Sequence, residues 1–137
     1  MTQIKFGTDG WRAIIGEAFT PDNVMQVAQA FADLYPHVHN TGREVIIGYD
    51  RRAMSKESAE LVASVLTANK IRTVLSDSFC PTPAVSYMTQ TRNGTAGVMI
   101  TASHNPANYN GIKFKESYGG AACPEYVQPI EAQIARN

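Results

Sequence analysis

The chain has 137 residues, of which 44% are hydrophobic, and this is enough to build one domain around one buried core. Twelve basic and twelve acidic side chains cancel, which argues against nucleic acid or an anionic membrane as the general partner. No stretch approaches the roughly 18 apolar residues that cross a bilayer, and the first residues lack the basic-then-apolar order of a signal peptide. The composition therefore predicts a soluble, cytoplasmic protein with no nucleic-acid and no membrane partner.

The first element that the pattern predicts is an amphipathic helix. Thr20 is expected to cap it, Pro21 to occupy its first position, and Asp22 to lie near the positive end of the helix dipole. Apolar residues then recur at spacings of three and four as far as Tyr35, and Pro36 is expected to end the helix.

The next segments predict a strand, a helix and a second strand. The run REVIIGYD, residues 43–50, is short, apolar and β-branched, as in a strand that is buried on both faces. Ser55 is expected to cap the helix, and residues 70–78, KIRTVLSDS, predict the strand after it. The inward face of that helix is predicted to carry Ala59, Leu61, Val62, Val65 and Leu66.

The remaining elements are a helix predicted over residues 83–92, a buried strand predicted over TAGVMITAS, residues 95–103, and a C-terminal element. In the last of these, apolar residues recur at helical spacing from Val127 to Ile134. Because Pro129 would interrupt a single helix starting at Pro124, we expect a broken or late-starting helix there.

This alternation of strands and helices predicts an α/β fold, a three-layer αβα sandwich with a largely parallel, mixed sheet. Ligands of such sheets bind in loops beyond the carboxyl ends of the strands. The loop after Asp50 and the loop that carries Ser103 should therefore share one edge of the sheet.

Metal-ligating residue types are few and scattered. Cys80 and Cys123 have neither CxxC nor mixed cysteine–histidine spacing, so we expect two free thiols rather than a zinc site or a disulfide. His37 and His39 could bind a metal from one face of an extended segment. They follow Pro36 in a predicted loop, however, and solvated side chains are the favoured interpretation.

The stretch GVMITASHNPANYNGIKF, residues 97–114, carries the first candidate site. One interpretation is local: Thr101, Ser103 and Asn105 would make turn hydrogen bonds to the backbone, and Pro106 would fix the exit from the turn. The other is chemical. A serine hydroxyl that carries a phosphoryl group needs cations around the transferred oxygens and a proton acceptor within reach. These could come from four side chains: Lys113, Arg12, His104 and Arg52.

The second unusual stretch is FGTDGWR, residues 6–12. Two glycines flank Thr8 and Asp9, so the backbone can turn tightly and offer N–H groups to an anion, and Arg12 follows as a bidentate phosphate ligand. An ordinary Gly-Asp-Gly turn is an equal alternative. The chain contains no GxGxxG, GxxxxGK[ST] or GxSxG motif, which removes the support for a dinucleotide, P-loop or hydrolase-elbow site.

Four motifs occur in order along the chain: FGTDGWR, GYDRR followed closely by Ser55, TASHNP and YNGIK. Together they resemble the α-D-phosphohexomutases, the phosphoglucomutase and phosphomannomutase family, over almost the whole chain. The resemblance implies that residues 1–137 form the family's first domain, the αβα domain with the catalytic phosphoserine. It also implies an intramolecular phosphotransferase, an isomerase that interconverts hexose 1-phosphate and hexose 6-phosphate through a bisphosphate.

The resemblance also implies roles for single residues. Ser103 would be the catalytic serine, Arg12 would neutralise charge near its phosphoryl group, and His104 and Lys113 would assist proton transfer, with the acid and the base unassigned. Asn105 is expected in the substrate- and phosphate-binding set.

Thr8 is expected in the same set, together with Arg12 and Lys113. Asp50 and Arg52 match the family's second loop and are expected to have an orienting or structural role.

Family members are about three times longer, with further domains II–IV around one cleft, and the chain matches only domain I. Mg²⁺ would bridge the phosphoserine to carboxylates of the second domain, so Ser103 would supply at most one metal ligand, through its phosphoryl group. Hexose phosphates would be the substrates and a hexose 1,6-bisphosphate the activator. The chain alone is expected to be nearly inactive, and it could self-associate through an exposed domain interface.

Two other functions stay open: a stand-alone sugar-phosphate binding module without turnover, and a serine-dependent phosphatase that releases inorganic phosphate. The sequence does not discriminate among glucose, mannose, glucosamine and pentose phosphates.

Overall fold

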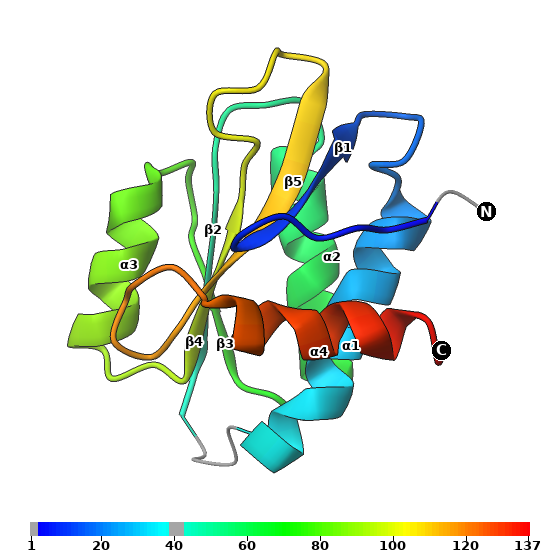
Figure 1. Cartoon of the computed structure of the whole chain (residues 1–137). Coiled ribbons are helices and arrows are strands. Elements are labelled where there is room, and N and C mark those ends of the chain that lie inside the picture. The colour runs from blue at the N-terminus through cyan, green and yellow to red at the C-terminus, as the bar shows by residue number, and fades with distance from the viewer. Residues whose placement is uncertain (1–2, 39–42) are drawn as a thin grey trace.

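The computed structural model describes residues 3–38 and 43–137, and the side chains of residues 3–35 and 43–137 (Figure 1). Five strands form one mixed sheet in the order β1-β5-β4-β2-β3. The strands are β1 (Gly10–Ile14), β2 (Val45–Tyr49), β3 (Thr73–Leu75), β4 (Ala96–Ile100) and β5 (Tyr109–Lys115). Strand β2 runs parallel to β3 and β4, whereas β5 runs antiparallel to β4 and β1.

Helices cover both faces of the sheet, which confirms the predicted three-layer αβα architecture. Figure 1 shows α3 on one face and α1 and α2 on the other, with α4 beside α1. The helices are α1 (Pro21–Val38), α2 (Ser55–Ala68), α3 (Thr82–Thr91) and α4 (Pro124–Ile134). No helix in the described part of the chain is long and apolar enough to cross a membrane.

The main core lies between the sheet and the layer of α1, α2 and α4. All five residues of both β2 and β4 are buried, as predicted for strands covered on both faces. The ring of Phe114 on β5 stacks on Phe31 of α1 at 5.2 Å, and Trp11 of β1 stacks on Phe19 at 5.3 Å. These aromatic contacts fix the two antiparallel strands on the helical layer.

Most predicted elements are confirmed, and several of their ends differ. Thr20 caps α1 as expected, since its hydroxyl accepts the amide of Asn23 at 3.3 Å. The same helix continues past Pro36 to Val38, so the predicted end is wrong. A proline lacks one amide donor, and losing one bond in a last turn does not unwind the residues around it. Strand β3 keeps only three of the residues predicted for it.

Two predictions about helix capping and continuity are wrong. Ser55 is the first residue of α2 and does not cap it; the N-cap position is Met54, without a side-chain cap. Helix α4 is continuous through Pro129, because burial of Val127 and Ile130 holds the helix together across the missing hydrogen bond.

The two cysteines are free thiols, as predicted. The histidine pair lies outside the described side chains, because residues 39–42 and the side chain of His37 are not described.

Candidate functional site

The candidate serine lies in the loop between β4 and β5, which we call the Ser103 loop (residues 101–108). The amide of Thr101 extends the β4–β5 ladder by donating to the carbonyl of Gly111 at 3.0 Å. The chain then leaves the sheet, and Ser103 adopts a left-handed conformation with φ 55° and an exposed side chain. Such a conformation is costly for a residue with a Cβ atom and is common at functional sites.

The loop after β2 meets the Ser103 loop at the same edge of the sheet, as predicted. Arg52 donates four hydrogen bonds to backbone carbonyls of that edge, and its side chain is only 15% exposed. The accepting carbonyls belong to Ser103 (2.9 Å), Asn105 (2.8 Å), Pro106 (2.7 Å) and Tyr109 (3.1 Å). The expected orienting role of Arg52 therefore has a concrete set of contacts.

The carboxylate of Asp50 links three side chains at this edge. Its carboxylate accepts the hydroxyl of Thr101 at 2.7 Å and the hydroxyl of Ser55 at 2.6 Å, and it lies 3.4 Å from the guanidinium of Arg52. The Ser55 hydroxyl in turn accepts the buried amide of Asn110 at 2.8 Å. Ser55 and Asn110 therefore tie helix α2 and strand β5 to the same carboxylate.

Arg12 comes to this edge from β1, where it pairs with Gly111 of β5. Its guanidinium donates to the side-chain oxygen of Asn105 at 3.1 Å, and its side chain is exposed. Asn105 is neutral, and no ion pair among the described residues involves Arg12. A full positive charge therefore stands beside the Ser103 loop.

Gly111 makes room for this arrangement. A Cβ atom there would lie 2.9 Å from Cγ of Arg12 and closer still to a neighbouring backbone oxygen. The glycine of the YNGIK motif thus allows the arginine side chain to cross the strand.

Lys113 projects from the same face of the sheet as Arg12. Arg12 pairs with Gly111, and Lys113 lies two residues after Gly111 on β5, so all three residues point to one face. Its ammonium group lies 3.7 Å from the carboxylate of Asp9, and the two side chains are 14% and 18% exposed. The FGTDGWR stretch therefore supplies Lys113 with its acidic partner.

The structure does not join every predicted site residue to this cluster. Thr8 and His104 are exposed, and no hydrogen bond or ion pair of the described residues involves their side chains. Arg12 and Asn105 are joined directly, whereas Lys113 reaches the cluster only by sharing the sheet face.

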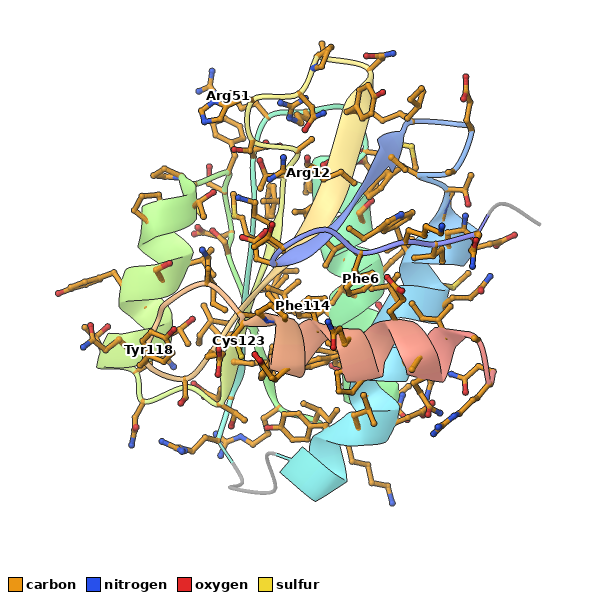
Figure 2. All side chains as sticks on the ribbon, in the orientation of Figure 1. Phe6, Arg12, Arg51, Phe114, Tyr118 and Cys123 are labelled. Atoms are coloured by element: carbon orange, nitrogen blue, oxygen red, sulfur yellow. The ribbon has the colours of Figure 1, made fainter. Side chains whose placement is uncertain are left out.

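A hollow of about 600 Å³ opens beside the carboxyl end of β2. It is lined by Asp50, Arg52, Arg51 and Phe79, among others. The guanidinium of Arg51 lies 4.1 Å from the centre of the Phe79 ring. Figure 2 shows Arg12 and Arg51 in the upper part of the molecule, where the Ser103 loop lies, whereas Cys123 lies lower, beside α4.

The described residues do not provide a metal cage. No group of three or more histidine, cysteine or acidic side chains is arranged to hold an ion in the described part of the chain. The carboxylates of Asp9 and Asp50 are already paired, Asp9 with Lys113 and Asp50 with Arg52. This donor set does not fit Mg²⁺ by itself.

The turn hydrogen bond expected of Thr101 is confirmed, whereas sequence reasoning missed the part played by Asn110. The Thr101 hydroxyl accepts the amide of Ser103 at 3.1 Å, and the side-chain oxygen of Asn110 accepts the amide of Gly111 at 2.8 Å. Both are buried polar residues, Thr101 directly after β4 and Asn110 within β5. A buried polar side chain needs a partner, so their positions were a usable signal.

Comparison with known proteins identifies the family of the chain. The family model described as "Phosphoglucomutase/phosphomannomutase, alpha/beta/alpha domain I" matches residues 3–137. The matched residues include the TASHNP and YNGIK stretches at the sheet edge described above. The chain belongs to the phosphoglucomutase/phosphomannomutase family.

Relatives with several names are similar to the chain over nearly all of its length. A "Probable phosphoribomutase" of Schizosaccharomyces pombe is 40% identical over 98% of the chain and 24% of that protein. A "Phosphoglucosamine mutase" of Alkaliphilus oremlandii is 39% identical over 96% of the chain and 29% of that protein.

A solved structure of a Thermus thermophilus protein described as a "putative phosphomannomutase" superimposes with a TM-score of 0.92 at 32% identity. The match covers 97% of this chain and 30% of that one. The chain thus spans about a quarter to a third of the length of the proteins it matches.

Proposed function

We propose that Ser103 is the phosphoryl carrier of a hexose-phosphate mutase and that this chain forms the domain that presents it. The observation that carries the proposal is an exposed serine in a left-handed conformation at the carboxyl end of a central strand, with the uncompensated Arg12 held at the same loop. In the forward half-reaction, the phosphoserine P–O bond breaks and a P–O bond to a sugar hydroxyl forms. The serine oxygen regains a proton, and the hydroxyl loses one.

The charges near the loop support this chemistry. Phosphoryl transfer depends mostly on positioning and on cations around the transferred oxygens. Arg12 would pair with the phosphoryl oxygens, and Asn105 orients its guanidinium. Lys113 would act as proton donor or electrostatic clamp after exchanging its contact with Asp9. His104, exposed beside the serine, would be the second group in proton transfer.

The substrate proposal rests on the family. Relatives named as mutases of glucose, ribose and glucosamine phosphates all match this domain, so sugar phosphates are the proposed substrate class. Thr8 lies in the exposed turn before Arg12 and is proposed as a phosphate contact. A bound Mg²⁺ would supply charge neutralisation at the phosphoryl group, with Ser103 as one ligand and other ligands from outside this domain.

The test is phosphopeptide mapping of the full gene product after incubation with a hexose 1,6-bisphosphate and Mg²⁺. A phosphoryl group on Ser103 is the expected result. Ser103→Ala should lose both the label and mutase turnover while melting like the parent, because the side chain is exposed. Ser64→Ala, an exposed serine on α2, is the matched control and should keep both.

Other outcomes separate the alternatives. Release of inorganic phosphate in place of an isomerised sugar would indicate a phosphatase. Sugar-phosphate binding without label on Ser103 and without turnover would indicate a binding module and would overturn the carrier role.

A further inference from the structure

We infer that Arg52 and Asp50 are positioning residues that hold Ser103 in the conformation from which it transfers phosphate, an inference that rests on the proposed carrier role. Both side chains contact the loop that carries the serine, and no hydrogen bond among the described residues involves the Ser103 hydroxyl. Arg52 binds the carbonyl of Ser103 directly, and Asp50 is linked to the amide of Ser103 through Thr101.

The first contact set is a guanidinium inside a ring of carbonyls. Arginine offers five N–H donors in one plane and accepts none. In Arg52 one terminal nitrogen bonds the carbonyls of Ser103 and Asn105, and the other bonds those of Pro106 and Tyr109. The remaining Nε faces the Asp50 carboxylate at 3.4 Å. The two terminal nitrogens thus make four hydrogen bonds to main-chain carbonyls, so the loop is held around a rigid planar group.

The second contact set reaches the Ser103 amide through a hydroxyl. Thr101 donates its only hydroxyl hydrogen to Asp50, which leaves the lone pairs of Oγ1 free to accept the amide of Ser103. The carboxylate therefore fixes the direction of the hydroxyl, and the hydroxyl fixes the amide. Arg52 binds the carbonyl of the same residue, so both backbone polar groups of Ser103 are held.

The conformation that these contacts hold is the left-handed backbone of Ser103. Four residues other than glycine have positive φ in the described chain, and two of them, Lys70 and Asn93, follow the ends of helices, where this conformation is ordinary. The other two are Ser103 and Met54. These two lie in the pair of loops that Arg52 joins, which is the pattern expected when contacts impose an unfavourable conformation.

Position matters in this reaction because a displacement of about 1 Å in a reacting group can cost on the order of a hundredfold in rate. A lysine in place of Arg52 keeps the charge but cannot bond four carbonyls in one plane. The loop would keep its sequence and its cations, and Ser103 would lose its fixed direction.

The experiment compares two charge-conserving changes, Arg52→Lys and Arg72→Lys, in the full gene product. Arg72 is exposed, pairs with Glu44 at 3.5 Å and lies just before β3, at the opposite edge of the sheet from the Ser103 loop, so it is the matched control. The rate of Ser103 phosphorylation by a hexose 1,6-bisphosphate is measured for folded protein. Arg52→Lys should lower the maximal rate at least tenfold with little change in the half-saturating bisphosphate concentration, and Arg72→Lys should leave both unchanged.

A second pair of variants tests the hydroxyl relay and remains informative if Arg52→Lys fails to fold. Thr101→Val keeps the branched shape of the side chain but removes the acceptor for the Ser103 amide and the donor to Asp50, whereas Thr101→Ser keeps both. The valine variant should lose rate, and the serine variant should recover most of it. Equal rates in the two would overturn the inference, as would a parental rate in folded Arg52→Lys. Absence of label on Ser103 in the parent would instead refute the proposed function.

Discussion

Replacing Gly111 with alanine tests how closely the two antiparallel strands and the Ser103 loop approach one another. A methyl group there would overlap the carbonyl oxygen of Trp11 and lie 2.9 Å from that of Thr101, and Cβ atoms essentially never come closer than 3.0 Å to such neighbours. Both contacts are with main-chain oxygens, one on β1 and one at the start of the Ser103 loop, so side-chain rotation cannot relieve them. The sheet has to open locally.

The expected loss of stability follows from these contacts. Overpacking of a well-packed interior costs about 1–3 kcal/mol. An unfolding entropy of about 2.1 cal/mol/K per residue gives a chain of this length about 0.3 kcal/mol/K, so the melting temperature should fall by about 3–10 °C. The same methyl group meets Cγ of Arg12 at 2.9 Å and should displace the guanidinium from Asn105.

The assay is thermal unfolding followed by far-UV circular dichroism, with Gly7→Ala as the control. At Gly7 the nearest atom beyond its chain neighbours would be 3.7 Å from the new methyl group, so that variant should melt like the parent. If Gly111→Ala melted within about 1 °C of Gly7→Ala, the reasoning about strand approach would be refuted.

Three further substitutions test the interior, helix α4 and a buried charge. Ser55→Ala should cost about 1–3 kcal/mol in urea unfolding, because its own buried hydroxyl joins the half-buried Asp50 to the buried Asn110, whereas Ser64→Ala should cost under about 0.5 kcal/mol; equal costs would contradict this. Pro129→Ala should add about 1–2 kcal/mol by restoring one helix donor, and a loss of stability would show that the proline ring packs better than it disrupts. Burial and nearby Lys113 hold the pKa of Lys115 below its ordinary 10.5, so the folded chain binds that proton less readily and stability rises with pH through the window below 10.5. Lys115→Met should therefore raise the melting temperature at pH 7, and its advantage should shrink as the pH approaches 10.5; a constant difference would refute the charge as the cause.

The parallel half of the sheet could be predicted from sequence because its strands are buried on both faces. VIIGY and AGVMI are continuous short apolar runs, and such runs bounded by polar loops are typical of covered strands. The shared edge of the Asp50 and Ser103 loops followed from the carboxyl-end rule.

Strands β1 and β5 were missed, although their period was readable. Only alternate residues are core residues there: Trp11 and Ala13 on β1, and Ile112 and Phe114 on β5. The residues between them are Arg12 and Lys113, whose charges fit a phosphate site as well as the polar half of a strand pattern. A half-covered antiparallel pair is what that alternation predicts.

The contacts of Arg52 lie beyond what a sequence pattern can specify. Its partners are main-chain carbonyls, so no residue type at positions 103, 105, 106 or 109 records them. The buried hydroxyl of Thr101 was readable as a polar group in need of a partner. Which partner it takes depends on how two loops fold across one another.

The mixed topology of the sheet explains how so short a chain assembles a serine and two cations. Strand β4 carries the chain out to Ser103, and β5 returns antiparallel beside it, so the residues after the loop come back along the strand that delivered it. Lys113 pairs with Met99, about 7 Å inward from Gly111, a depth that a lysine side chain can span. Strand β1 is antiparallel to β5 and therefore parallel to β4, which brings Arg12 to the same edge from the other side. Had β5 been a parallel strand reached by a crossover, the loop would have been followed by a helix, and the lysine could not have lain ten residues after the serine.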